Sequence, residues 1–265
     1  MSILRIENCS ISYDEDKYAV EQVSLDVEEG EIVSIVGESG SGKTTLIRGV
    51  MGLLPSGGQI SGGKIWFKDR ELTAMTEAEL QAIRGKLMAM IFQDPGLSLD
   101  PVNRIESQYR ESIRTHNKRV SRDTCRDMAK KMLKAMHLTD ADRVLRSYPI
   151  ELSGGMKQRV GIAMGMTARP LLLLADEPTS ALDVTIQAQV VREMKELRDT
   201  YGTSIVLVTH NMGVASYLSD KIGVMNQGRL VEYGTRGEVI FHPKEAYTRS
   251  LLDAVPKLGG KRYGE

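Results

Sequence analysis

One glycine-rich segment has the residue types and spacing of a loop that binds phosphate. In order, it consists of Gly37, Glu38, Ser39, Gly40, Ser41, Gly42, Lys43 and Thr44, with Thr45 next. Glycines let backbone N–H groups turn inward around phosphate oxygens, and a following helix adds its positive dipole end. Lys43 would neutralise phosphate charge, and the Thr44 hydroxyl is placed to ligate Mg²⁺. Because an apolar run precedes the segment and a helical pattern follows it, we predict a nucleotide site rather than a chance Gly/Ser turn.

Two adjacent acids, Asp176 and Glu177, follow the apolar run 171–175. Taken alone, such a pair would more simply cap a helix or lie in a loop. However, a strand buried on both faces of a parallel sheet delivers its carboxyl-end residues to the edge where phosphate ligands bind. We therefore expect Asp176 to hold Mg²⁺, through water, and Glu177 to polarise the attacking water as the catalytic base.

Two further polar residues end apolar runs. His210 follows the run 204–209 and should leave the sheet at the same edge as Glu177, where it could contact the γ-phosphate. A lone histidine is more often structural than catalytic. Gln93 follows the run 88–92, and one glutamine by itself indicates no chemistry.

A second group of unpaired backbone N–H donors is predicted where a later helix begins. The segment contains Leu152, Ser153, Gly154 and Gly155, and the helix that it opens includes Gln158. Its helix start would again present N–H groups and a positive dipole end to an anion. Since the chain already holds one complete phosphate loop, we expect this second anion site to face a second nucleotide.

The elements that must position these residues follow from apolar periodicity. Strands are predicted at 3–13, 23–27, 31–36, 62–68, 88–92, 171–175, 204–209, 221–225 and 228–232, and helices at 43–52, 184–200 and 212–218. Residues 94–168 lack a strong strand signal and show helical spacing. There, a stripe of Cys125, Met128, Met132 and Met136 predicts either the core of a small helical subdomain or an adaptable surface for a partner.

Composition limits the possible settings. The 265 residues suffice for one large domain or a domain with a subdomain, and a formal net charge of zero gives no overall field that favours nucleic acid. Cys9 and Cys125 match no metal-ligand spacing, so we expect free thiols in a reducing compartment. No signal peptide or membrane-spanning apolar run is evident. We therefore expect any work at a membrane to occur from the cytoplasm, by docking onto other proteins.

The sequence resembles the ATP-binding-cassette family along nearly its whole length, most specifically in its signature motif. That motif corresponds to Leu152-Ser153-Gly154-Gly155-Met156 followed by Lys157-Gln158-Arg159. The resemblance implies an α/β fold of the P-loop NTPase class with a mainly parallel core sheet, an N-terminal antiparallel β subdomain and an inserted α-helical subdomain. It divides a single domain, 1–265, into a core with its β subdomain at about 1–93 and 169–240, a helical signature subdomain at about 94–168 and a tail at about 241–265.

The family likeness also implies roles for individual residues. Gln93 matches the Q-loop glutamine, whose amide would reach Mg²⁺ and the attacking water, and His210 matches the switch histidine. The run Ser180-Ala181-Leu182-Asp183 resembles the D-loop that links two ATP sites. Tyr13 resembles the aromatic residue that stacks on adenine, with Val20 beside it, although a tyrosine packed at a strand end would explain position 13 equally well without the family.

Within the family, the sequence looks most like the ATPase subunits of oligopeptide, dipeptide and nickel importers. The runs 93–95, 98–101, 176–189 and 247–256 carry this likeness, and Gly154-Gly155-Met156 suggests the D-type member of a heteromeric pair. The likeness implies that ATP, held between the phosphate loop of one cassette and the signature of the other, closes the pair to drive import. The implied partners are two transmembrane permeases, an F-type ATPase paralogue and an extracytoplasmic solute-binding protein, with residues 93–104 meeting a permease at the cytoplasmic face of the membrane.

Two departures and one rival class remain. Relatives often have His where this sequence has Ile150. They also often carry a longer C-terminus with several cysteines and an iron–sulfur site, and the lack of these cysteines keeps a nickel or metal-chelate cargo open beside peptides. A DNA-repair ATPase would need a long coiled coil where 94–151 stands, and a translation factor would carry two cassettes in one chain. A P-loop kinase would have no use for the signature.

Overall fold

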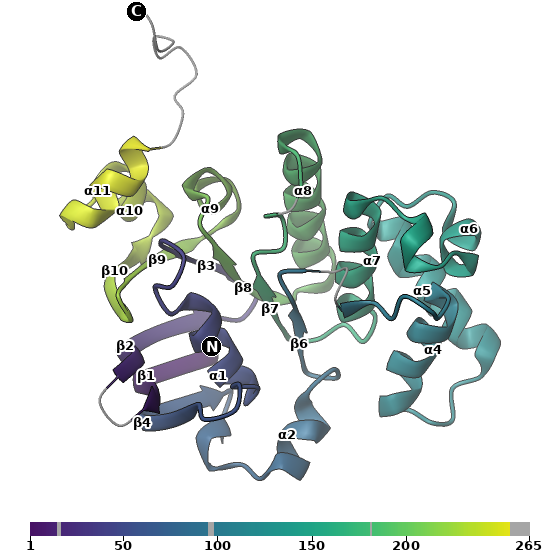
Figure 1. The fold of residues 1–265 in the computed structure, drawn as a ribbon, viewed down its shortest axis with the longest axis horizontal. Helices are drawn as coiled ribbons and strands as arrows, with labels where there is room; N and C mark the ends of the chain where they lie inside the picture. The colour runs from purple at the N-terminus through teal and green to yellow at the C-terminus, as the bar shows by residue number, and fades with distance from the viewer. Residues whose placement is uncertain (15–16, 95–97, 181, 255–265) are drawn as a thin grey trace, which may run out of the picture.

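The computed structural model describes residues 1–14, 17–94, 98–180 and 182–254, arranged as two β-sheets with surrounding helices (Figure 1). Pro95, Ala181, Val255 and Pro256, quoted above as parts of family motifs, lie outside the described residues. The sheets carry the nucleotide-binding segments predicted above, and most of the helices cover their faces.

The first sheet is antiparallel and is built mainly from the N-terminal part of the chain. Its order is β2-β1-β4-β5, from β1 (Ser2–Asp14), β2 (Lys17–Glu28), β4 (Gln59–Phe67) and β5 (Arg70–Glu71). Buried and exposed residues alternate along β2 and β4, as expected of strands with one face on the core. The predicted antiparallel β subdomain is confirmed, and β2 begins six residues before the predicted strand at 23–27.

The second sheet has six strands in the order β10-β9-β3-β8-β7-β6. These are β3 (Ile32–Val36), β6 (Met88–Ile91), β7 (Leu172–Asp176), β8 (Ser204–Thr209), β9 (Lys221–Asn226) and β10 (Arg229–Thr235). All pairings are parallel except β9 with β10. The predicted mainly parallel core sheet is therefore confirmed, and every residue of β3, β7 and β8 is buried.

Helices occupy the remaining space. They are α1 (Lys43–Met51), α2 (Glu77–Ile83), α4 (Ile105–His116), α5 (Arg122–Ala135), α6 (Ala141–Arg146), α7 (Gly154–Met166), α8 (Val184–Tyr201), α9 (Met212–Leu218), α10 (Arg236–Phe241) and α11 (Ala246–Asp253), with 3₁₀ turns at Leu72–Ala74 and Pro149–Glu151. Helices α4 to α7 gather at one end of the molecule, away from the antiparallel sheet (Figure 1). The inserted helical subdomain is thus confirmed, whereas α2, α10 and α11 had no predicted counterpart.

Two apolar cores lie on opposite faces of the parallel sheet. Leu172 and Leu174 of β7 belong to the core shared with α1 and the antiparallel sheet, whereas Leu173 and Ala175 belong to the core shared with α5, α7 and α8. Met132 and Met136 of the predicted stripe are almost fully buried in the second core. Cys125 is buried as well, whereas Met128 is half-buried and lines a pocket. The interpretation of the stripe as subdomain core is therefore confirmed for Met132 and Met136.

The second core runs without a break from the helical end to the sheet. It joins Leu133 of α5 and Val160 of α7 to Leu207 of β8. The boundaries near residues 93 and 168 therefore do not separate two independent cores, and this division of the domain stays a prediction. Within the described residues, no helix has both the length and the apolar character that crossing a membrane requires.

Candidate active site

The glycine-rich loop joins β3 to α1 and is shaped by backbone contacts. Gly37 and Gly42 have φ values of 151° and 97°, conformations that favour glycine. A Cβ on Gly37 would lie 2.2 Å from the Met225 carbonyl oxygen, and one on Gly42 would lie 2.3 Å from that of Ala19. Any other residue at either glycine would displace the loop from β9 or β2.

The Lys43 ammonium is held inside this loop. Its Nζ donates to the carbonyl oxygens of Gly37 at 2.8 Å and Glu38 at 2.7 Å, and to Ser41 Oγ at 3.3 Å. Burial lowers the pKa of Lys43, while the nearby carboxylates of Glu177 and Asp176 oppose that shift. Glu38, Ser39 and Gly40 form the exposed rim of the loop, whereas Thr44 and Thr45, in the first turn of α1, are half-buried.

Asp176, the last residue of β7, lies beside the start of α1. The Thr44 hydroxyl donates to Asp176 Oδ1 at 2.8 Å, while Asp176 Oδ2 is buried and has no hydrogen-bond partner among the described residues. Burial raises the pKa of Asp176, opposed by the Thr44 hydrogen bond and the positive charges of Arg48 and Lys43. A buried carboxylate oxygen without a partner, next to a hydroxyl, fits a hard divalent cation.

Glu177 gathers the remaining polar residues predicted for this edge. Its Oε2 accepts from Gln93 Nε2 at 3.4 Å and lies 3.1 Å from His210 Nδ1. The sheet brings these three residues together because they follow the parallel strands β6, β7 and β8. Glu177 also has φ of 43°, a left-handed conformation that is costly for a residue with a Cβ and is often found at functional sites.

The second predicted anion site lies at the start of α7. The Ser153 hydroxyl caps this helix by accepting from Met156 N at 3.3 Å. A Cβ on Gly154 would meet no atom within 4 Å, whereas one on Gly155 would lie 2.8 Å from Ile186 Cγ2 of α8. The two glycines thus differ: Gly154 leaves open space above the helix start, and Gly155 permits close packing on α8. A cavity of about 390 Å³ lies between this helix start and residues 182–186.

Other predicted residues of these motifs have clear local roles. Leu152 and Gln158 are buried, with 6% and 2% of their surface exposed, so their side chains do not lie open to a second nucleotide in this arrangement. Asp183 caps α8 by accepting from Thr185 N and Ile186 N, both at 3.1 Å. The Ser180 hydroxyl donates to the Glu177 carbonyl oxygen at 3.1 Å.

The two residues predicted to contact adenine, Tyr13 and Val20, lie in different environments. Tyr13 is half-buried near the end of β1, and its ring lies close to Gly58, where a Cβ would be 2.7 Å from Tyr13 Cε1. Val20 is fully buried in the core beneath the antiparallel sheet. A direct contact of Val20 with a base is therefore not supported, and stacking on Tyr13 stays a prediction.

Sequence reasoning missed several contacts of the site because they depend on tertiary structure. Arg48, on α1, acts electrostatically on Asp176. Gln187 of α8 donates to Thr179 Oγ1 at 3.0 Å and accepts from Asn211 Nδ2 at 3.4 Å, joining the segments after Glu177 and His210. The Tyr247 hydroxyl of α11 accepts from Glu38 N at 3.1 Å. No spacing rule links these residues in sequence.

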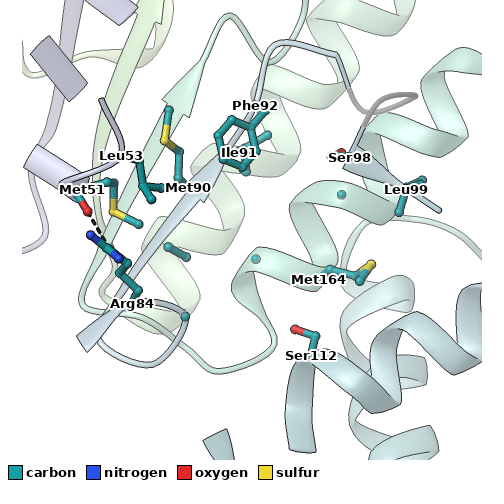
Figure 2. A pocket seen from close by; sticks show the side chains of 14 residues that line it. Met51, Leu53, Arg84, Met90, Ile91, Phe92, Ser98, Leu99, Ser112 and Met164 are labelled. Atoms are coloured by element: carbon teal, nitrogen blue, oxygen red, sulfur yellow. Dashed lines mark hydrogen bonds between the residues drawn. The ribbon is translucent and has the colours of Figure 1, made fainter. Parts of the chain in front are cut away.

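An apolar groove lies between the sheet and the helical end of the molecule. Figure 2 shows its walls: Met51 at the end of α1 with Leu53 after it, Met90 and Ile91 of β6 with Phe92 after them, and Met164 of α7. Arg84 closes one end of the groove, where its Nε donates to the Met51 carbonyl oxygen at 2.6 Å. The groove has a volume of about 310 Å³, and Phe92 stands 40% exposed at its edge.

Comparison with known proteins places this geometry in a family. The sequence model of the ABC transporter family matches residues 20–180. The dipeptide transport ATP-binding protein DppD of Lactococcus lactis subsp. cremoris is 42% identical over 257 residues, which are 96% of this chain and 74% of that protein. The oligopeptide transport ATP-binding protein AmiE of Streptococcus pneumoniae is 42% identical over 91% of this chain and 68% of that protein. The glutathione import ATP-binding protein GsiA of Escherichia coli is 42% identical over 98% of this chain, which spans 43% of GsiA.

Solved structures agree with the sequence comparison. The bacterial ABC transporter cassette MJ0796, described as dimeric and in one structure bound to ADP and Pi, superimposes with a TM-score of 0.78 at 28% identity and covers 88% of this chain. The match includes 98% of the MJ0796 chain. With a glycine-rich loop around Lys43 and the adjacent acids Asp176 and Glu177 at one edge of the parallel sheet, this chain belongs to the ABC transporter family as one of its ATP-hydrolysing cassettes.

Proposed function

We propose that this chain is the ATPase subunit of an importer for di- or oligopeptides, working as one of two cassettes that close on ATP. In this proposal the phosphate loop at 37–44 holds the nucleotide, Glu177 activates the water, and the start of α7 completes the ATP site of the partner cassette. Differential binding of ATP to the open and closed pair would drive the movement of the attached permeases.

The observation that carries the hydrolytic role is the environment of Glu177. Its carboxylate lies beside the phosphate loop that holds Lys43, and the Gln93 amide and the His210 imidazole contact it. A carboxylate held this way can accept a proton from water, while the amide and the imidazole orient that water and contact the terminal phosphate. The positive φ of Glu177 fixes the direction in which its side chain leaves the sheet.

Magnesium fits the same edge of the sheet. Asp176, the Thr44 hydroxyl and the Gln93 amide oxygen are the oxygen donors available to it, and Asp176 Oδ2 still lacks a partner among the described residues. Bound there with the nucleotide, the ion would supply charge neutralisation for the phosphates. No group of three His, Cys, Asp or Glu side chains that could hold a metal by itself occurs in the described part of the chain. Phosphate oxygens would therefore complete the ligand set.

The second cassette follows from the two separate anion sites. The open space at Gly154 and the cavity beside it belong to the helix start at Ser153, which is distinct from the phosphate loop. In support, the similar cassette MJ0796 is described as dimeric. We propose that the second cassette is the F-type paralogue suggested by Gly154-Gly155-Met156. A second copy of this chain is the alternative.

The apolar groove is the proposed contact with a permease. Its walls come from both the parallel sheet and the helical end of the molecule. A bound partner segment would therefore contact both parts and respond to any movement of one relative to the other. Ser98 and Leu99 line it, and both belong to the segment 93–104 for which the family resemblance implies a permease contact. A short amphipathic segment of a membrane partner would bury Leu53 and Phe92 there. Such a contact would hold the subunit at the cytoplasmic face of the membrane, which is part of the proposal.

The cargo is proposed from the relatives. Those most similar in sequence include proteins named for dipeptide, oligopeptide and glutathione transport, which favours peptides over a nickel or metal-chelate cargo. An extracytoplasmic solute-binding protein would select the peptide. The permeases and that binding protein, rather than this chain, would determine specificity.

The test uses Phe92→Glu, which puts a charge into the apolar groove. We expect this variant to bind ATP normally but to lose co-purification with two permeases and a second cassette from detergent-solubilised native membranes, detected by mass spectrometry. Phe241→Glu is the matched control, because Phe241 on α10 is 75% exposed and does not line this groove. Retention of permeases by Phe92→Glu, or recovery of ribosomes or DNA by the unchanged protein, would contradict the proposal.

A further inference from the structure

The peptide unit between Gly37 and Glu38 is held on both sides. Its carbonyl oxygen accepts from Lys43 Nζ at 2.8 Å, and its N–H donates to the Tyr247 hydroxyl at 3.1 Å. A peptide group is planar, so fixing the direction of its N–H also fixes the direction of its carbonyl. The Tyr247 hydroxyl therefore acts on the same rigid unit that holds the lysine of the phosphate loop.

Tyr247 lies on α11, 209 residues after Glu38 in the sequence, and two sets of contacts hold it in place. The Glu232 carboxylate of β10 accepts from Lys244 N at 2.8 Å and Glu245 N at 3.3 Å, which fixes the chain just before the helix. Tyr247 packs against an apolar cluster that contains Val36 and Val239. Since Val36 directly precedes Gly37, one cluster joins the base of α11 to the start of the loop.

We propose that Tyr247 is a positioning residue of the nucleotide site: its hydroxyl orients the Gly37–Glu38 peptide so that the carbonyl keeps Lys43 directed into the phosphate loop. This inference rests on the loop binding ATP and does not depend on the permease or the cargo. It assigns a role to the C-terminal helix that the phosphate-loop pattern does not include. The helix helps to preorganise the loop, although it lies far outside that motif.

The expected effect is on nucleotide affinity rather than on the chemical step. Without the hydroxyl, the Glu38 N–H can turn to water, and the peptide can rotate away from the lysine. Lys43 would then interact less favourably with the phosphates of both the bound substrate and the transition state. A loss shared by both raises KM and leaves kcat unchanged.

The first experiment compares Tyr247→Phe with Tyr217→Phe in the full chain. Tyr217→Phe is the matched control, since Tyr217 on α9 is half exposed and its hydroxyl makes no hydrogen bond within the described residues. We expect Tyr247→Phe to raise the KM and the dissociation constant for ATP by about two- to tenfold, the range of one neutral hydrogen bond, with kcat within a factor of about two. The control should match the unchanged protein in both quantities.

A second measurement reads the hydrogen bond itself. Amide hydrogen exchange of the peptide that contains Glu38, followed by mass spectrometry without nucleotide, should be faster in Tyr247→Phe than in the control. Equal ATP affinities and equal exchange rates in the two variants would overturn the inference. A large fall in kcat with KM unchanged would also overturn it, because the hydroxyl would then act on the transition state alone. Either result would leave the importer proposal untouched.

Discussion

At the scale of single residues, Glu177 combines the clearest chemistry with the least favourable backbone. Its left-handed φ is maintained by neighbours: Glu177 N donates to the Val208 carbonyl oxygen at 2.9 Å, and the Ser180 hydroxyl holds the Glu177 carbonyl oxygen. A strained conformation persists only when the surroundings determine it, at a cost on the order of 1–3 kcal/mol. The strain here directs the carboxylate toward Gln93 and His210.

Replacing this carboxylate by an amide tests its proposed role. We expect Glu177→Gln to bind ATP with unchanged affinity and to lose at least about 100-fold in turnover, because the amide cannot accept the proton of water. ATP should then trap the closed pair, visible as a dimer by size-exclusion chromatography with light scattering. Glu111→Gln, at an exposed site on α4, should behave like the unchanged protein. Normal turnover in Glu177→Gln would remove this residue from the reaction.

The site residues that could be predicted from sequence share one property. Lys43, Asp176 and His210 each follow or begin an element whose pattern is strong, so the edge of the sheet on which they lie can be inferred. Tyr247 and Arg48 could not be placed this way, because their contacts depend on how α11 and α1 pack. Val20 shows the opposite error: a residue near the site in sequence is buried in the core beneath it.

At the scale of elements, an ion pair with a buried carboxylate joins helix α7 to helix α8. Arg159 Nε of α7 lies 3.1 Å from Glu193 Oε2 of α8, and His137 Nδ1 lies 3.4 Å from Glu193 Oε1. Glu193 is only 1% exposed, and burial raises its pKa, opposed by the charges of Arg159 and His137. Any movement of α7 relative to α8 must therefore stretch an ion pair whose carboxylate lies out of water.

Removing one partner of the Arg159–Glu193 ion pair should lower the free energy of unfolding more than removing both. We expect Arg159→Met to lower the free energy of unfolding by about 3–5 kcal/mol, and Arg159→Met with Glu193→Leu to restore most of it, because the double variant leaves no buried charge. Urea unfolding monitored by circular dichroism gives both values. Lys131→Met, on the exposed face of α5, is the control. A double variant no more stable than the single one would show that the pair has no coupling.

The same pair sets a pH dependence. In Arg159→Met, the pKa of Glu193 in the folded state rises further above its ordinary value of 4.5, so the folded protein binds more protons than the unfolded chain at pH values above 4.5. Stability then falls as pH rises through that window. The destabilisation by Arg159→Met should therefore be larger at pH 7 than at pH 5.

The sequence pattern predicts the bounds of a strand well where all of its residues are buried. The strand 204–209 was predicted with its observed bounds, since all six residues are buried and polar or turn residues flank it. The apolar pattern starts the next strand at Leu171, one residue before β7 begins. Leu171 is 37% exposed, and its N–H donates to the Leu87 carbonyl oxygen. Helix α2 has only Leu80 and Ile83 buried, too few to produce a periodic signal.

At the scale of the whole molecule, the central sheet makes the two cores depend on each other. Alternate residues of β7 and β8 face opposite cores, so neither face can open without disturbing the strands that the other needs. Cys9 is buried in the core of the antiparallel sheet, and Cys125 is buried on α5 at the helical end. Both cysteines are free, as predicted.

These thiols report whether the molecule unfolds as one unit. Burial raises the pKa of Cys9 to about 11. Because both thiols are buried away from the reagent, we expect no alkylation of either native cysteine by iodoacetamide at pH 8. As urea increases, both should become labelled in the same transition, as located by mass spectrometry of the digested protein. Labelling of Cys125 at clearly lower urea than Cys9 would show that the helical end opens separately, despite the shared sheet.

The carbonyl oxygen of Ala19 has a consequence for how this sequence can vary. A Cβ on Gly42 would lie 2.3 Å from that oxygen and one on Gly228 would lie 3.1 Å from it, while Gly228 N donates to the Ser41 carbonyl oxygen. The phosphate loop thus packs against main-chain atoms of β2 and of the turn at Gly228. Every amino acid has these atoms. Position 19 should therefore accept many substitutions in a saturation library, whereas positions 42 and 228 should accept almost none. The residues most intolerant of change here would be those that have no side chain.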